Sequence, residues 1–237
     1  AVDIINADSD LTDYALVIAP MLYMVRAGFA ERAEAFVRAG GYFVATYWSG
    51  IVNETDLCHL GGFPGPLRPL LGVWAEEIDS LTDEQSQGVE ALPDSGLRGS
   101  WRARELCEVI HTEGAEVLAC YRDDFYAGYP ALTQHRVGKG KAFYVASRND
   151  DAFHQEFTRL LVSALKLPRA LEAALPTGVV TTRRSDGEWE WVFVQNYTDN
   201  EQIISLADTF HNAVSGEKVE NSLTLAAWGC EVLTRAL

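Results

Sequence analysis

The stretch Gly40-Gly41-Tyr42-Phe43-Val44-Ala45-Thr46-Tyr47-Trp48-Ser49-Gly50 decides the fold class that we predict for this chain. Its first two glycines predict the end of a helix, because glycine readily adopts the left-handed conformation that closes many helices. The apolar run that follows is typical of a buried strand, and the residues after it predict a turn. Ligands of open α/β sheets bind at the carboxyl ends of strands, so residues 47–50 are the first candidate site.

Upstream of this stretch, the sequence predicts a second strand and the helix that joins the two strands. Residues 15–19 form a continuous apolar run, which suits a strand buried on both faces of a parallel sheet. Phe29, Ala33, Phe36 and Val37 then recur at helical spacing. The order strand, helix, strand predicts a βαβ unit with a right-handed crossover.

Downstream, glycine and proline at 61–66 predict a shaped loop, and a short helix is expected at 66–71. Residues 78–98 predict edge strands and loop. Asp150 lies in a predicted N-cap for a helix that places Phe153 and Phe157 on its apolar face. Short strands are predicted before that helix, the last two of them joined as a hairpin, at 107–110, 117–121, 131–136 and 142–146.

The periodicity predicts two domains. Residues 1–169 are expected to form an α/β open sheet. Residues 170–176 are the predicted linker, and residues 176–237 are expected to form a small, antiparallel, all-β domain resembling a sandwich. Its predicted strands are separated by turn residues and lie at 178–184, 190–196, 202–206, 222–225 and 231–234.

The net charge argues against nucleic acids and anionic membranes as partners. Among 237 residues, 19 are basic and 34 are acidic, a net charge of -15, whereas nucleic acids and anionic membranes attract basic patches. No apolar run is long enough to span a bilayer. The four cysteines are scattered without a paired motif, so we expect them to be reduced and mostly buried, in a cytoplasmic protein without a metal site or another cofactor.

Ser49 is the candidate nucleophile, since hydrolases of the α/β class carry a serine on a sharp turn after a strand. That turn needs glycine two positions before and after the serine, where this chain has Tyr47 and Ile51. No histidine lies in a recognisable base motif, and a serine without a base is a weak nucleophile. We therefore favour a turn whose aromatic side chains contact a partner, with a hydrolase or amidotransferase-like enzyme using Ser49 as an alternative.

Two further patterns can be interpreted either as structural or as functional. Carboxylate doublets such as Glu76-Glu77 and Asp123-Asp124 are more typical of solvated turns than of catalytic pairs, which face each other across a pocket. Trp189 and Trp191 lie on one side of a predicted strand and could stack on sugars. Small sandwiches more often use such residues in the core, so a carbohydrate-binding module is a second alternative.

Several of these segments resemble the glycoside hydrolase family 42 β-galactosidases. Thr46-Tyr47-Trp48-Ser49-Gly50-Ile51-Val52-Asn53-Glu54 and Leu60-Gly61-Gly62-Phe63-Pro64-Gly65-Pro66-Leu67-Arg68 resemble their middle, trimerisation domain. Residues 130–146 look like the end of that domain, and residues 178–198 resemble the small C-terminal β domain.

The resemblance implies an enzyme in which two glutamates on a separate (β/α)8 barrel hydrolyse terminal β-D-galactosides with retention. Nothing in this chain corresponds to that barrel, so no catalytic residue is assigned and the chain alone is expected to be inactive. The resemblance also implies that residues 1–169 form a flavodoxin-like or class I glutamine-amidotransferase-like sheet. The first strand and helix of that α/β domain are expected to be missing from this chain. The implied partners are two further copies, in a homotrimer, and the barrel, through which galactosides are bound. The expected pocket or contact residues are Tyr47, Trp48, Ser49, Asn53, Glu54 and Phe63.

Overall fold

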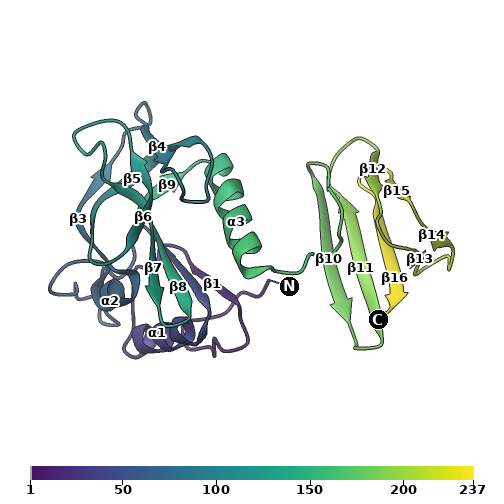
Figure 1. Ribbon diagram of the computed structural model, residues 1–237, viewed down its shortest axis with the longest axis horizontal. Coiled ribbons are helices and arrows are strands. Elements are labelled where there is room, and N and C mark those ends of the chain that lie inside the picture. The colour runs from purple at the N-terminus through teal and green to yellow at the C-terminus, as the bar shows by residue number, and fades with distance from the viewer. Residues whose placement is uncertain (1) are drawn as a thin grey trace. The chain divides into compact units, whose positions relative to one another are not determined.

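The computed structural model describes residues 2–237, which form two compact units (Figure 1). The first is Ile5–Lys166 and the second consists mainly of Leu167–Leu237. Figure 1 shows helices and a sheet in the first unit and strands alone in the second. The predicted fold class, a mixed α/β sheet followed by a small antiparallel all-β domain, is confirmed.

The sheet of the first unit runs in the order β1-β2-β8-β7-β6-β4-β5-β3, and β9 pairs with β5. β1, β2 and β8 are parallel to one another, and the other pairings are antiparallel. The hairpin predicted between β7 and β8 is confirmed. The strands are β1 (Leu16–Ala19), β2 (Tyr42–Thr46), β3 (Val73–Ser80), β4 (Gln87–Ala91), β5 (Ser100–Thr112), β6 (Glu116–Tyr121), β7 (Pro130–Val137), β8 (Gly140–Val145) and β9 (Ser147–Asn149).

Helices pack on both faces of this sheet. The predicted helix α1 (Phe29–Ala39) is confirmed and buries its apolar face in one core, together with α2 (Arg68–Leu71), which follows the 3-10 turn Gly65–Leu67. α3 (Asp151–Leu165) contributes to a second core. Side chains of β8 alternate between the two cores, since successive residues of a strand point to opposite faces.

α3 begins as the sequence predicts. The side chain of Asp150 accepts a hydrogen bond from the backbone N–H of Phe153 at 2.9 Å, which satisfies one free donor of the first turn.

Three local predictions for this unit found strands but were wrong in their burial, length or place in the sheet. β1 is an edge strand with 56% of Ile18 exposed, because a partner lies on only one of its sides. The strand predicted at 107–110 is the end of the much longer β5, whose polar first half pairs with β4 and β9. β4 is internal to the sheet, between β5 and β6.

The second unit is built from two antiparallel sheets. One has the order β10-β11-β16-β13-β14, and the other pairs β12 with β15. Val192 and Val194 enter the core between them, whereas Trp189 and Trp191 lie on the outer face, so a core position for these tryptophans was the wrong prediction. The strands are β10 (Val179–Ser185), β11 (Trp189–Asn196), β12 (Gln202–Ser205), β13 (Phe210–Asn212), β14 (Lys218–Val219), β15 (Ser222–Leu225) and β16 (Cys230–Ala236).

Within residues 2–237, no helix combines the length and the apolar character needed to cross a bilayer. The cysteines are free thiols, but Cys58 and Cys230 are exposed, which contradicts the prediction that most are buried.

Candidate contact surface at the end of strand β2

The turn after β2 is a tightly bonded frame in which Ser49 is buried. The Ser49 hydroxyl donates a hydrogen bond to the carbonyl of Thr46 at 2.6 Å and accepts one from the backbone N–H of Leu22 at 3.0 Å. A serine nucleophile needs an accessible oxygen and a base that takes its proton. Here the proton is held by a main-chain carbonyl, so Ser49 ties the turn to the segment after β1.

Trp48 has a left-handed backbone, with a φ of 58°, a conformation in which non-glycine residues are uncommon. Its backbone N–H donates to the carboxyl of Glu108 on β5, at 2.8 Å, while its side chain is 38% exposed. The other Glu108 oxygen accepts from the hydroxyl of Tyr144 on β8, at 2.6 Å. The buried carboxyl group of Glu108 therefore holds the backbone of the turn in place.

On the solvent-exposed side of this turn, the Trp48 side chain lies beside other exposed apolar side chains. Its ring meets the ring of Tyr23 edge to face, with centroids 6.4 Å apart. Met21 and Tyr23 are both about as exposed as Trp48, and hydrogen bonds from residues 21–25 join their segment to β2 and its turn. We call Met21, Tyr23 and Trp48 the Trp48 surface. Tyr47 is half-buried beside it, and burial raises the pKa of its hydroxyl.

The glycine-rich loop supports the turn by backbone contact. Gly50 has a φ of 64°, and a Cβ there would lie 2.1 Å from the carbonyl oxygen of Pro64. A Cβ on Gly65 would lie 2.7 Å from the carbonyl oxygen of Gly50. Phe63 is half-buried and packs on the α1 core, so it anchors the loop internally and is not the exposed anchor that the sequence suggested.

Asn53 and Glu54 lie on the next loop. Their contacts do not include the turn after β2. The Asn53 side chain accepts hydrogen bonds from the backbone N–H groups of Thr55 and Leu57 and so closes its own turn. Glu54 is exposed. Both line a pocket of about 250 Å³ with residues at the start of α1. A larger pocket of about 510 Å³ lies over the other end of α1 and includes none of the predicted site residues.

Sequence reasoning missed Glu108, the residue on β5 that connects the turn with Tyr144 on β8. It stands in the apolar run Cys107-Glu108-Val109-Ile110, and a carboxylate within such a run is costly to bury without partners. That position was a usable signal. Its partners were not, because Trp48 and Tyr144 are 60 and 36 residues away in the chain.

The described residues offer no ready metal site. Across residues 2–237, no three histidine, cysteine, aspartate or glutamate side chains gather closely enough to hold a metal ion.

Comparison with known proteins gives two family matches that fill most of the chain. A family described as the beta-galactosidase trimerisation domain matches residues 1–168, and one described as the beta-galactosidase C-terminal domain matches residues 178–235. Both matches fall on these accessory portions and not on a catalytic barrel.

Curated relatives are considerably longer than this chain. Beta-galactosidase Pbg of Clostridium perfringens is 48% identical over 98% of the chain, and beta-galactosidase BglY of Alicyclobacillus acidocaldarius is 49% identical over the same share. The chain spans only 34% of either protein. Among solved structures, the beta-galactosidase from Rahnella sp. R3 is 59% identical with a TM-score of 0.96, covering 100% of this chain and 34% of its own.

Proposed function

This chain belongs to glycoside hydrolase family 42, as the trimerisation and C-terminal domains of a β-galactosidase, and from that premise we propose that it holds such an enzyme together as a homotrimer. The observation that carries the proposal is that these two matches fill the chain, while its curated relatives are about three times as long. The chain itself supplies assembly, and another part of the parent enzyme carries the two glutamates that hydrolyse terminal β-D-galactosides with retention.

The Trp48 surface is the proposed contact with a neighbouring copy or with the catalytic barrel. Tryptophan and tyrosine dominate the binding energy of many protein interfaces, and here they project from a frame fixed by hydrogen bonds. A fixed frame supports the proposal because a partner then loses little conformational freedom on binding. Tyr47, beside this surface, and Asn53 and Glu54, on the next loop, are secondary contact candidates, and galactosides are bound only through the barrel.

Two finer features are also proposals. The parallel strands β1, β2 and β8, with helices on both faces, support an amidotransferase-like relationship of the first unit. The exposed free thiols of Cys58 and Cys230 support a reducing compartment, and we propose the cytoplasm.

Light scattering of the chain tests the assembly role. The expected mass is three times 26.1 kDa, and Trp48→Asp should shift it toward one copy because it places a charge in the contact. Trp228→Asp, at an exposed tryptophan of the second unit, is the matched control and should leave the mass unchanged. A monomer at every concentration, or hydrolysis of an aryl β-galactoside by the chain alone, would contradict the proposal.

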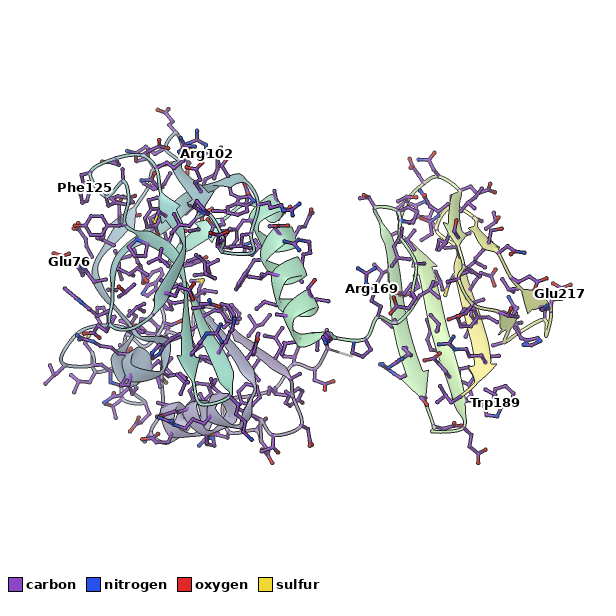
Figure 2. All side chains as sticks on the ribbon, viewed as in Figure 1. Glu76, Arg102, Phe125, Arg169, Trp189 and Glu217 are labelled. Carbon is purple, nitrogen blue, oxygen red and sulfur yellow. The ribbon has the colours of Figure 1, made fainter. Side chains whose placement is uncertain are left out.

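One observation favours a second candidate function, sugar binding by the second unit. Trp189 is 45% exposed on the outer face of its sheet, with its ring in the open in Figure 2, and Trp191 lies on the same face. Such rings can stack on the apolar face of a sugar. Titration with galactose should then change the tryptophan fluorescence, and Trp189→Ala should remove that change. No fluorescence change in the wild-type chain would eliminate this candidate.

A further inference from the structure

The carboxyl group of Glu108 has an environment that suits a titrating group. It lies on β5, fully buried, and faces two hydrogen-bond donors, the Trp48 N–H and the Tyr144 hydroxyl. Of these, the Trp48 N–H belongs to the residue whose ring forms the Trp48 surface. We propose that Glu108 is a positioning residue for Trp48, and that proton uptake by its carboxyl group loosens the turn that presents the indole ring.

The groups that face Glu108 leave its charge without a cation. Tyr144 on β8, Tyr121 on β6 and Cys107 on β5 all interact with it electrostatically, and burial raises the pKa of each of the three above its ordinary value. They are therefore neutral at physiological pH. No ion pair within residues 2–237 includes Glu108, and the paired Arg148 and Glu105 act on the neighbouring Tyr47 instead.

Burial disfavours the charged carboxylate and raises the pKa of Glu108 to about 7, although the hydrogen bonds from Tyr144 and Trp48 lower it in part. The two protonation states differ in hydrogen bonding. The carboxylate accepts from both donors at once. The protonated acid brings a third hydrogen into the same space, so one donor loses its acceptor, or the acid donates to the Tyr144 oxygen, which also faces the N–H of Ser49.

The left-handed backbone of Trp48 makes the conformation of the turn sensitive to the protonation state of Glu108. An L-residue is strained in that conformation, so the turn needs bonds that favour it. A hydrogen bond to a carboxylate is roughly twice as strong as one to a neutral acceptor. Neutralisation of Glu108 therefore weakens the bond that holds Trp48, while the Ser49 bonds keep the rest of the turn in place.

The test is ¹⁹F NMR of the intact chain labelled with 5-fluorotryptophan, with the Trp48 signal assigned by Trp48→Phe. The Trp48 signal should shift with a midpoint near pH 7, and the signals of the other five tryptophans should not follow it. Glu108→Gln, a neutral mimic, should hold the Trp48 signal at its low-pH position at every pH. Glu105→Gln, on the same strand but exposed, should leave the titration intact.

A Trp48 signal that does not shift with pH, or that shifts equally in the Glu108→Gln chain, would overturn the proposal. Should Glu108→Gln fail to fold, Tyr144→Phe replaces it. It removes one donor to the carboxylate, so the midpoint should move to higher pH, and an unchanged midpoint would also count against the proposal.

The consequence for assembly rests on the function proposed above, and light scattering on either side of pH 7 separates the two. Fewer trimers at the lower pH, with no pH effect in the Glu108→Gln chain, would support control of assembly by Glu108. A monomer at both pH values would contradict the assembly role. The titration of the Trp48 signal would then still decide whether Glu108 positions Trp48.

Discussion

Each of the two units buries a glutamate side chain, and the two glutamates are held in opposite ways. In the first unit, Glu108 meets an N–H and a hydroxyl but no cation. In the second unit, Glu190 is 1% exposed and forms ion pairs with Arg183 at 3.1 Å and Arg235 at 2.7 Å. Arg235 also pairs with Asp208 and lies over the ring of Phe210.

The difference shows that burial alone does not decide what a carboxyl group does. Two guanidinium groups make the Glu190 carboxylate part of the structural framework of the second unit. Two neutral donors leave Glu108 close to balance between charged and neutral forms, because hydrogen bonds offset only part of the cost of desolvation. One buried carboxylate of this chain is therefore paired with two cations, and the other with neutral donors alone.

The largest effect is expected from making Glu190 resemble Glu108. Replacing both Arg183 and Arg235 by methionine leaves the Glu190 charge buried and unpaired, which should cost the second unit about 4 kcal/mol of unfolding free energy at neutral pH. Calorimetry of the intact chain measures this loss.

Arg184→Met is the control for that change. Arg184 is exposed, and its guanidinium donates to the carbonyl of Arg183, so its loss should alter stability by no more than about 0.5 kcal/mol. A double variant as stable as this control would show that the ion cluster does not hold the second unit together.

A second, smaller effect is the pH dependence that Glu108 should give to the stability of the first unit. The pKa of Glu108 is about 7 in the folded chain, against an ordinary value of 4.5. Between these values the folded state keeps a proton that the unfolded state has lost, so stability should fall as the pH rises through this window and then level off. The contribution is about 3 kcal/mol at most, and Glu108→Gln should remove it.

Calorimetry from about pH 5 to about pH 8 measures this contribution as the difference between the wild-type and Glu108→Gln chains, because the other carboxyl groups contribute equally to both. Glu77→Gln, at an exposed position of the same unit, is the matched control and should follow the wild-type curve. A wild-type curve parallel to that of Glu108→Gln would mean that Glu108 is ionised throughout the window.

Local sequence patterns predicted much of the fold but few of the contacts that hold the turn after β2. The helix over 29–39 and the hairpin before α3 follow from apolar spacing and turn residues that lie close together in the sequence. The outer position of Trp189 was not predictable in this way. Alternation separates the two faces of β11, but only the placement of the second sheet decides which face is buried.

At the turn, the sequence predicted the turn itself but not the contacts of Ser49. Topology favoured a nucleophile there, and the structure places the serine hydroxyl in a main-chain hydrogen bond. The decisive contacts join Trp48 to Glu108 and Leu22 to Ser49, across 60 and 27 residues. No local pattern contains such pairs.

The smallest predicted effect compares two tryptophans with the same backbone conformation. Trp48 and Trp228 each have a φ of 58°, but the N–H of Trp228 donates to the carbonyl of Thr198, at 3.0 Å, instead of to a side chain. At each position we expect the glycine variant to exceed the alanine variant in stability by about 1 kcal/mol, since glycine relieves the left-handed strain.

Adding Glu108→Gln to these variants should change the stability gap at position 48 but not at position 228. Once the carboxylate is gone, an alanine at position 48 is free to leave the left-handed region, so the gap between its glycine and alanine variants should shrink. At position 228, in the other unit, the main-chain carbonyl remains and the gap should persist. Unfolding free energies of the eight variants measure both gaps. Equal gaps at position 48 with and without Glu108 would mean that the Ser49 bonds alone hold the turn, and that Glu108 is buried beneath it without controlling it.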